Sequence, residues 1–348
     1  MSSSINVGLI GFGLSGRYFH APFLSTNERF RLTHVVERRR NEAQAFDPAL
    51  RTVRSHEELL ANPAIELVVI GTPNDTHFAY AKAALEAGKH VLIEKPFANT
   101  SAEARELLQL AKDKNLVAIP YQNRRYDADF LTIRHVLAEG LLGEVVEYEA
   151  HFDRFRPEVL DTWKEHDPQG GGNLLNLGPH LVDQAVVLFG EPDGVFADLR
   201  TLRPGATLDD YFEIRLYYPN RRVILKSSLV APENRLRYVI HGTRASLTKS
   251  GLDVQEETLR RHVLPTTADW GAEPPEHYAT LTTADGRQTV ASLPGNYHPF
   301  YDNLARAIRG ERAPEITPRQ AYATIRILEL AHESAQTGRV CAFAGLPD

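Results

Sequence analysis

The sequence predicts an α/β protein of two domains: an N-terminal domain with a parallel sheet, and a C-terminal α+β domain with a largely antiparallel, open sheet. Up to about residue 120, short apolar strands alternate with amphipathic helical segments, which is typical of a parallel sheet covered by helices. Later strands are longer and are joined by turns. The chain, at 348 residues, also exceeds the size at which single cores tend to divide. We place the domains at residues 1–120 and 121–348, with C-terminal helices over about 298–338.

The strands expected in the first domain are short runs rich in Val and Ile, apolar on both faces. They are predicted at Ile5–Ile10, Leu32–Val36, Leu67–Gly71, His90–Ile93 and Val117–Pro120. Helical patterns between them are predicted at His56–Ala61, Thr76–Ala87 and Ser101–Lys114. The second of these is followed by Gly88, a suitable C-terminal cap.

The second domain is predicted to contain strands with one polar face and to end in a helix. The strands are expected at Glu144–Phe155, Gly194–Leu202, Tyr211–Tyr218, Arg222–Val230 and Arg235–His241. Apolar and polar residues alternate in the third of these, so one face of the sheet should be open, and we expect it to join copies of the chain into a homodimer or homotetramer. A capping box formed by Thr317 and Gln320 begins the last helix, with Pro318 at its first position, and Gly338 stops it.

Composition argues against several classes of function. A formal charge of -6 disfavours nucleic-acid binding through phosphates, and no apolar run approaches the roughly 18 residues of a membrane helix. The single cysteine, Cys341, can form neither an internal disulfide nor a thiolate metal site, so we expect no metal. The start of the chain has no signal-peptide pattern. We therefore expect a cytoplasmic protein with a small-molecule substrate.

Three glycines follow the first strand directly, in the stretch LIGFGLSGRYFH, and open a helical segment. This context predicts a Rossmann dinucleotide-binding turn. Gly11 permits a tight turn, Gly13 lets a pyrophosphate approach the backbone, and Gly16 lets the helix pack on the strand. Backbone amides there lie at the positive end of a helix, where phosphate is stabilised. The turn contributes Gly11, Phe12, Gly13, Leu14, Ser15 and Gly16 to the expected cofactor site.

The end of the second strand bears on the choice of nicotinamide cofactor. Glu37 lies 21 residues beyond Gly16, where this fold places an acid that binds the ribose hydroxyls, and it favours NAD. The arginines that follow, Arg38, Arg39 and Arg40, could neutralise the 2′-phosphate of NADP or form a solvated loop. We predict NAD or NADP, with NAD favoured, and assign Glu37 and Arg38 to the cofactor site.

Two polar clusters follow the third and fourth strands, at the carboxyl edge where such sheets bind ligands. The first, GTPNDTH, contributes Thr72, Pro73, Asn74 and His77 to the expected cofactor site. Its alternative interpretation is a turn capped by Asp75 or Thr76. The second, EKP, contributes Glu94 and Lys95, and a lysine between a buried strand and a proline is held in the crevice.

A third cluster lies in GGGNLLNLGPHLVDQ. Asn176, His180 and Asp183 are spaced i, i+4 and i+7, so they share one face of a predicted helix. The glycines at residues 170–172 would let the chain approach a ligand or a neighbouring strand. A polar trio after a glycine run favours a functional site over a solitary structural histidine.

These motifs, together with YQNRRYDADFLTIR and HFDRFRPEV, resemble the Gfo/Idh/MocA family, named for glucose-fructose oxidoreductase and inositol dehydrogenase, essentially from end to end. The segments NRRYD and DRFRPEV further resemble the subgroup that includes scyllo-inositol dehydrogenases. The resemblance implies an NAD(P)-dependent oxidoreductase. It would transfer a hydride between nicotinamide and a secondary alcohol of a cyclic polyol or sugar.

The resemblance also assigns catalytic residues. Lys95 and His180 match the lysine and histidine that flank the reacting carbon, and we expect one to take the hydroxyl proton while the other orients the hydroxyl. Burial and the nicotinamide cation would lower the pKa of the lysine, and such a base contributes about 10²- to 10⁴-fold. Asn176 stands where the family usually has aspartate. Because it supplies no negative charge, Lys95 should be easier to deprotonate.

The expected substrate site combines donors, acceptors and an aromatic face, as hydroxyl-rich ligands require. Its residues are Lys95, Asn123, Tyr126, Asp153, Arg154, Arg156, Trp163, Asn176 and His180, and Asn123 and Arg124 are also assigned to the cofactor. Arg124 or Arg125 could instead form an interdomain salt bridge, and Trp163 could belong to the core.

Two other functions fit the same motifs. A glycoside-cleaving enzyme of the family would use bound NAD to oxidise C3 transiently, and it would recycle the reduced cofactor rather than release it. A cofactor-binding sensor without turnover is the second alternative. The presence of both Lys95 and His180 argues against the sensor, because a sensor needs no proton relay.

Overall fold

The computed structural model describes residues 4–267 and 269–346, and the chain forms two compact units. The first unit comprises Met1–Asn123, Gln255–Trp270 and Asn296–Ala321. The second comprises Arg124–Val254, Gly271–Gly295 and Tyr322–Asp348. The first crossing lies close to the boundary that we placed at residue 120. Two later segments nevertheless belong with the first unit, and no local composition signal marks them.

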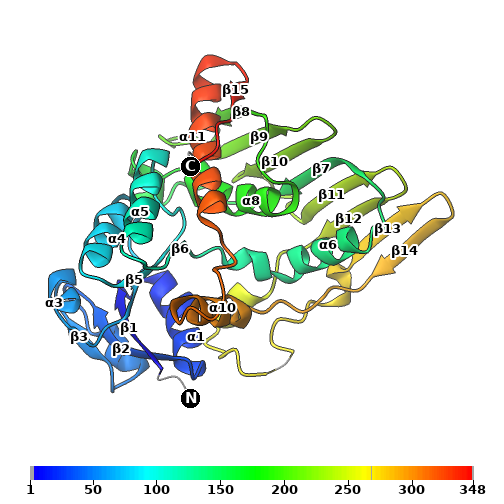
Figure 1. The fold of residues 1–348 in the computed structure, drawn as a ribbon. Coiled ribbons are helices and arrows are strands. Elements are labelled where there is room, and N and C mark those ends of the chain that lie inside the picture. Colours follow the sequence, from blue (N-terminus) through cyan, green and yellow to red (C-terminus); the bar gives the residue numbers. More distant parts are fainter. Residues whose placement is uncertain (1–3, 268, 347–348) are drawn as a thin grey trace. The chain divides into compact units, whose positions relative to one another are not determined.

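The first unit contains a six-stranded parallel sheet in the order β3-β2-β1-β4-β5-β6 (Figure 1). Its strands are β1 (Ile5–Ile10), β2 (Phe30–Val36), β3 (Arg51–Val53), β4 (Leu67–Ile70), β5 (His90–Ile93) and β6 (Ala118–Pro120). The last residues of four strands align in register across the sheet, in the row Ile10, Ile70, Ile93 and Pro120. The segments after these strands therefore leave the sheet at one edge, side by side.

Short helices connect these strands. They are a π-helical turn (Gly16–His20), α1 (Ala21–Thr26), α2 (Glu42–Phe46), α3 (His56–Leu60), α4 (His77–Glu86) and α5 (Ser101–Asp113). The later segments add α9 (Gln255–Arg260) and α10 (His298–Ile308). The predicted cap of α4 is confirmed, because Gly88 has a positive φ of 76° and its amide donates to the carbonyl of Leu85.

The second unit contains a nine-stranded sheet in the order β14-β13-β12-β11-β7-β10-β9-β8-β15. Its strands are β7 (Val145–His151), β8 (Gly194–Arg200), β9 (Tyr211–Tyr217), β10 (Arg222–Ser228), β11 (Leu236–Gly242), β12 (Ser246–Ser250), β13 (Ala279–Thr283), β14 (Gly286–Val290) and β15 (Cys341–Ala342). Among the described strand pairs of this second sheet, only β7–β10 is parallel, so the predicted, largely antiparallel sheet is confirmed.

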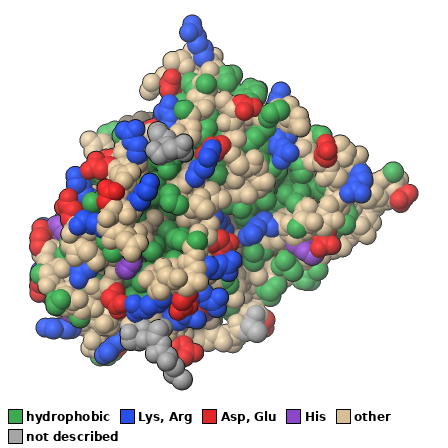
Figure 2. Space-filling view, viewed as in Figure 1, with side chains coloured by type: hydrophobic (Ala, Val, Ile, Leu, Met, Phe, Trp, Pro, Cys, Tyr) green, Lys and Arg blue, Asp and Glu red, His purple; other side chains and the backbone are tan. Residues whose placement is uncertain are grey.

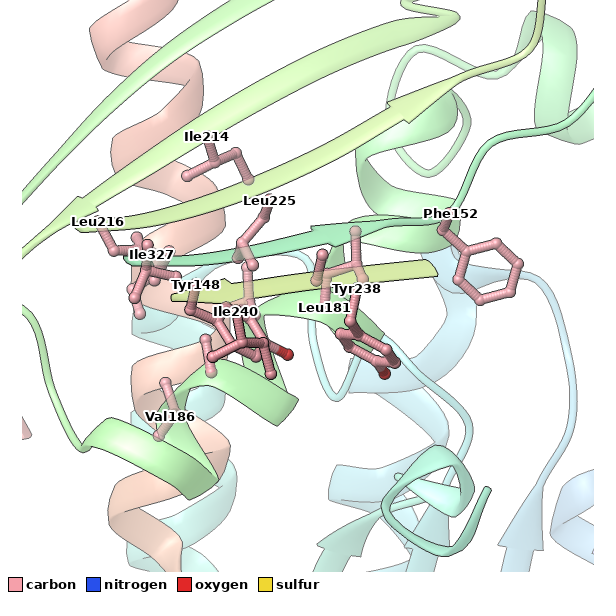
Figure 3. Close-up of a cluster of buried hydrophobic side chains, with 14 of the residues drawn as sticks. Tyr148, Phe152, Leu181, Val186, Ile214, Leu216, Leu225, Tyr238, Ile240 and Ile327 are labelled. Carbon is pink, nitrogen blue, oxygen red and sulfur yellow. The ribbon is translucent and has the colours of Figure 1, made fainter. Parts of the chain in front are cut away.

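One face of this sheet is covered by helices. They are α6 (Ala128–Ala138), α8 (Asn173–Phe189) and α11 (Pro318–Thr337), and a short helix, α7 (Trp163–His166), precedes α8. The core between sheet and helices includes Tyr148 and Leu225 from strands, Leu181 from α8 and Ile327 from α11 (Figure 3). This apolar layer fixes α8, which carries His180, against the strands.

Two features of the fold differ from expectation. The strand predicted at Leu32–Val36 was expected to be buried on both faces, but Leu32, Thr33 and His34 are half-buried, because on the side away from β1 this strand pairs only with the three-residue edge strand β3. The strands β3 and β12–β15 were not predicted, because each has at most five residues and a weak apolar pattern. The capping box of α11 is confirmed: the Gln320 amide donates to Oγ1 of Thr317 at 3.2 Å.

No helix within the described residues has the length and apolar character needed to cross a membrane. Lysine and arginine side chains are interspersed with aspartate and glutamate over the face in Figure 2, without a large region of one sign.

Candidate active site

The glycine turn after β1 is built by close backbone packing. A Cβ on Gly16 would lie 2.3 Å from the carbonyl oxygen of Gly11, and one on Gly11, whose φ is 93°, would lie 2.8 Å from that of Gly71. A Cβ on Gly13 would meet no atom within 4 Å. Gly11 and Gly16 are therefore required by packing, whereas Gly13 faces open space that a phosphate could occupy. These residues fit a dinucleotide pyrophosphate.

The other residues of this turn offer a nucleotide mainly their backbone groups. Phe12 is buried, and its ring makes an edge contact with Phe46 of α2 at a centroid distance of 6.0 Å. Leu14 is exposed and Ser15 is half-buried. Phe12 can therefore serve a nucleotide only through its backbone, while its side chain anchors the turn.

Glu37 is engaged by the helix that follows it. Its two carboxylate oxygens each accept a backbone amide, from Glu42 and Ala43, at 3.0 Å. The side chain is buried and acts as the N-terminal cap of α2. The side chains of Arg38 and Arg39, in contrast, are exposed and make no hydrogen bond or ion pair with other described residues. The acid expected to bind ribose is therefore buried and holds two backbone amides, and two guanidinium groups beside it are accessible.

His77 joins the turns after β4 and β5. It is fully buried at the first position of α4, as predicted, and its Nδ1 lies 2.8 Å from the Pro96 carbonyl oxygen. Its Nε2 lies 3.0 Å from the Thr72 carbonyl oxygen. Burial lowers the pKa of His77, although both hydrogen bonds oppose this. His77 thus links the turn after β4 to the turn after β5 from a buried position. Of the other residues of this turn that were assigned to the cofactor site, Asn74 is buried and Pro73 is exposed.

Lys95 follows Glu94 at the carboxyl end of β5, at the same edge of the sheet as the glycine turn. Lys95 is half-buried, and the Lys95–Pro96 peptide bond is cis. The Glu94 carboxylate is buried and accepts the backbone amide of Lys95 at 3.1 Å. Burial alone would raise the pKa of Glu94, but the hydrogen bond and charge of His20 and the charge of Lys95 lower it below its usual value.

In the second unit, α8 presents Asn176 and His180 one turn apart. Oδ1 of Asn176 accepts a hydrogen bond from Nζ of Lys164 at 3.2 Å. His180 is buried, with its ring centroid 6.4 Å from that of Phe152. The third member of the predicted trio, Asp183, is paired with Arg125 through two hydrogen bonds and is structural.

The glycine run before α8 packs against protein atoms. A Cβ on Gly172 would lie 2.3 Å from Oδ1 of Asp209, and one on Gly171 would lie 2.6 Å from the carbonyl oxygen of Asp167. Asp209 accepts the backbone amide of Leu174 at 2.6 Å and so caps α8. Burial raises its pKa to about 6. The close neighbours of this run are therefore the segments around Asp167 and Asp209, which are not strands, whereas a ligand or a neighbouring strand was expected.

The residues assigned to the substrate differ in their surroundings. Arg124 and Arg154 both stack on the Phe152 ring, at 4.9 and 5.1 Å from its centroid. Arg124 also forms a 3.0 Å ion pair with Asp127 inside the second unit. Asp153 accepts the Ser228 amide at 2.7 Å, and its other oxygen lies 3.1 Å from Nδ1 of His151.

The remaining assigned residues range from buried to exposed. Asn123 and Tyr126 are buried at the two ends of a 3₁₀ turn. Arg156 is exposed, and Trp163 is 36% exposed, with the Lys164 ammonium 5.6 Å from its ring centroid. Trp163 is therefore not a core residue and remains able to contact a ligand.

The sequence did not predict which side chains contact the predicted site residues. His20, which lies 3.2 Å from Glu94, carries a signal in hindsight: it is the fourth residue after Gly16, in the segment that leaves the glycine turn. Lys164 and Asp209 carry no such signal, because each reaches its partner on α8 from elsewhere in the second unit.

Family models match most of the chain. Residues 5–122 match the NAD-binding Rossmann fold of an oxidoreductase family, and residues 134–343 match the C-terminal alpha/beta domain of that family. The match covers the first glycine turn and EKP in one model, and Asn176 and His180 in the other.

Related proteins match over nearly their whole length. An uncharacterized oxidoreductase of Escherichia coli, YdgJ, is 44% identical over 97% of this chain and 98% of its own. The scyllo-inositol 2-dehydrogenase (NADP(+)) IolW of Bacillus subtilis is 38% identical over 97% and 95%. The structure of YvaA from Bacillus subtilis, at 36% identity, superposes with a TM-score of 0.95 over 99% of both chains. The chain belongs to the Gfo/Idh/MocA family of oxidoreductases, with an NAD-binding Rossmann fold.

Proposed function

We propose that this oxidoreductase is an NADP-dependent dehydrogenase that acts on a secondary alcohol of a cyclic polyol or sugar of the inositol type. The observation that supports this most strongly is the position of Lys95. It leaves β5 at the sheet edge where β1 delivers the glycine turn, and dinucleotides bind at that edge in such sheets. A side chain there is placed to serve the nicotinamide end of a cofactor.

NADP replaces NAD as the favoured cofactor because of Glu37. The side chain of Glu37 is buried, and each of its oxygens already accepts one backbone amide of α2, so it is less accessible to ribose hydroxyls than an exposed carboxylate would be. Arg38 and Arg39 are exposed beside it and would pair with a 2′-phosphate through charged hydrogen bonds. The related IolW is named as an NADP(+) enzyme, which agrees with this assignment.

In the proposed reaction the cofactor supplies the hydride acceptor. Lys95 and His180 share the proton chemistry: one removes the hydroxyl proton as the hydride leaves the carbon, and the other donates a hydrogen bond that orients the oxygen. A neutral imidazole can accept a proton directly, whereas the Lys95 ammonium must first lose one. The pair follows from the family resemblance. Asn176 would bind a substrate hydroxyl by hydrogen bonds without adding charge.

The experiment is a panel of inositols, sugars and their oxidised forms, assayed for production or consumption of reduced nicotinamide with each cofactor. We expect free NADPH to form in proportion to the ketone product. Cleavage of a glycoside without net NADPH would identify the glycoside-cleaving alternative, and binding without turnover across the panel would identify the sensor. Either of those results would reject the proposed dehydrogenase.

We also propose that the open face of the second unit's sheet joins two copies of the chain. Cross-strand pairing places Phe196, Arg215, Ile224, Glu149 and Val239 in one row on this face. Three apolar side chains alternate along it with one arginine and one glutamate, and these opposite charges could pair across a two-fold axis. Ile224→Arg should therefore lower the mass measured by light scattering, and an unchanged mass would exclude this interface.

A further inference from the structure

One buried guanidinium, that of Arg203, is the centre of a hydrogen-bond cluster in the second unit. The residue lies three positions beyond the end of β8, and its side chain is almost fully buried. Nε donates to Oδ2 of Asp210 at 3.0 Å, and the same carboxylate oxygen accepts the backbone amide of Arg203 at 2.9 Å. Asp210 immediately precedes β9, so this pair fixes the guanidinium to the end of the sheet.

The other side of the guanidinium faces a surface segment, residues 156–165. Its two terminal nitrogens donate to the carboxylate oxygens of Glu165 at 3.3 and 2.6 Å. One of them, Nη1, also donates to the backbone carbonyl oxygens of Arg156 and Glu158, at 3.2 and 3.0 Å. Arg203 therefore binds both ends of the 156–165 segment at once.

Little else in this segment is buried. The residues from Arg156 to Lys164 are exposed apart from one half-buried valine, and the exposed ones include the large apolar side chains of Leu160 and Trp163. A segment with so few buried apolar contacts has a low local stability, so its position depends on its hydrogen bonds. The contacts with Arg203 are thus a main determinant of where the segment lies.

The end of the segment lies against the start of α8. The carbonyl oxygen of Lys164 accepts the backbone amide of Gly172 at 2.9 Å. A Cβ on Gly171 would lie 2.8 Å from that oxygen, so this approach requires the glycine. Nζ of Lys164 donates to Oδ1 of Asn176 at 3.2 Å. The backbone and the side chain of Lys164 therefore both contact the first turn of α8 or the glycines before it.

Lys164 defines the orientation of the Asn176 amide. An ammonium group only donates hydrogen bonds, so the amide oxygen must face Lys164 and the amide NH2 group lies on the other side. An NH2 group donates hydrogen bonds, which the oxygen atoms of hydroxyl and carbonyl groups accept. Lys164 thus determines which hydrogen-bonding group Asn176 offers to a substrate.

We infer that Arg203 and Lys164 are positioning residues for the substrate. Arg203 holds the 156–165 segment, and through that segment Lys164 turns the Asn176 amide so that its NH2 group donates to a substrate oxygen. This role rests on the proposed function, in which Asn176 binds a substrate hydroxyl.

Arginine suits the central position because its planar guanidinium carries five N–H donors in a fixed fork. Two carboxylates and two carbonyl oxygens surround the guanidinium. A lysine has three donors on a single nitrogen, so Arg203→Lys keeps the positive charge beside Asp210 but cannot bind all four groups. This substitution should release the 156–165 segment while the sheet stays folded.

The first test follows the segment by fluorescence and needs no substrate. The chain has two tryptophans, so Trp270→Phe, in the first unit, leaves Trp163 as the reporter. In this background we expect Arg203→Lys to lower the fluorescence anisotropy of Trp163, while the circular dichroism spectrum stays that of the parent. Unchanged anisotropy would overturn the role of Arg203.

Glu165→Gln gives the same readout without a change to the buried guanidinium, because Arg203 keeps its ion pair with Asp210. It removes the charge that binds the segment to Arg203, so it should also lower the anisotropy, by a smaller amount. Arg200→Lys is the matched control, because Arg200 forms an exposed ion pair with Asp198 at 2.7 Å on β8 and should change nothing. An equal fall in this control would overturn the assignment to Arg203.

The second test separates positioning from general stability by steady-state kinetics. Lys164→Met removes the ammonium, and Arg203→Lys displaces it. Each should raise KM for the substrate about 10-fold, the value of about one hydrogen bond, with kcat within a few-fold and NADPH affinity unchanged. Because both act through Asn176, the double variant should raise KM by much less than the product of the two single effects. Effects that simply multiply would overturn the link between Arg203 and Lys164.

The two tests distinguish this inference from the proposed function. If the wild type turns over no polyol or sugar, the proposed function fails and the substrate role of these residues fails with it, whereas the anisotropy still shows whether Arg203 holds the segment. If turnover is present and the anisotropy falls but KM does not change, the proposed function stands and the substrate role of Arg203 and Lys164 is overturned.

Discussion

The guanidinium of Arg125 is bound by the carboxylate of Asp183 through hydrogen bonds of 2.8 and 2.6 Å, and both side chains are buried inside the second unit. Helical spacing alone had grouped Asp183 with Asn176 and His180 as a candidate functional trio. The salt bridge instead ties α8 to the turn at Arg125, one helical turn beyond His180. Its contribution should therefore appear in stability.

Asp183→Asn should lower the free energy of unfolding by about 3–5 kcal/mol, because it leaves the buried Arg125 charge without its partner. Urea denaturation measures this loss. The double variant Arg125→Met, Asp183→Leu removes both charges and should be less destabilised than Asp183→Asn. If the single variant unfolds like the wild type, the buried pair is not a structural element of α8.

Arg38→Ala should weaken NADPH binding by about 10- to 100-fold, the value of one or two charged hydrogen bonds, and leave NADH binding nearly unchanged. The dissociation constants can be measured by fluorescence titration. Arg40→Ala is the control, since Arg40 already pairs with Glu42 at 2.9 Å. Equal weakening of both cofactors would place Arg38 outside a 2′-phosphate site and restore Glu37 as the ribose ligand.

Asn176→Asp should preserve the fold, because an aspartate oxygen can accept the same hydrogen bond from Lys164. In carbonyl reduction, where Lys95 donates the proton, the added carboxylate favours the ammonium form, so the alkaline limb of the pH-rate profile should move upward. Lys164→Gln in the same background should enlarge the shift, since Lys164 offsets part of the new charge. An unchanged profile would show that Asn176 does not influence Lys95.

Asp209 should make the protein less stable as pH rises through about 6. Burial raises its pKa from 3.8 to about 6 in the folded chain, so folding favours the protonated form. The stabilisation from this group is complete below about pH 4 and is lost above pH 6, and a shift of this size corresponds to about 3 kcal/mol at most.

The check is the pH dependence of unfolding free energy for Asp209→Asn against the wild type. The amide can still accept the Leu174 amide hydrogen but carries no charge, so the difference between the proteins should grow in favour of the variant between pH 4 and 7. Asp161→Asn, at a fully exposed side chain, is the control. A difference that does not vary with pH would mean that Asp209 has an ordinary pKa.

The sequence predicted the parts of the fold that depend on local pattern. The strands from Ile5 and His90 and the glycine turn between β1 and α1 follow from apolar runs and from backbone packing that only glycine allows. The return of residues 255–270 and 296–321 to the first unit could not be predicted, because it depends on long-range packing. Short strands such as β3 were missed because so few residues carry no clear apolar pattern.

In the site, residue types could be predicted but their hydrogen-bond partners could not. Glu37 was expected at the ribose because of its distance from Gly16, yet its carboxylate caps α2. Spacing from the glycine turn does not show this cap, and ribose binding by Glu37 stays a prediction. Likewise, His77 was expected to face a cofactor, whereas both of its nitrogens hold backbone carbonyls.

The most direct test of the central claim, that Lys95 takes part in proton transfer during NADP-dependent oxidation of a polyol or sugar, is kcat for Lys95→Met on the best substrate of the panel. NADPH affinity is measured alongside as the control for cofactor binding. The account predicts a fall in kcat of about 10²- to 10⁴-fold with NADPH affinity little changed. A variant that turns over within a few-fold of the wild type would contradict it.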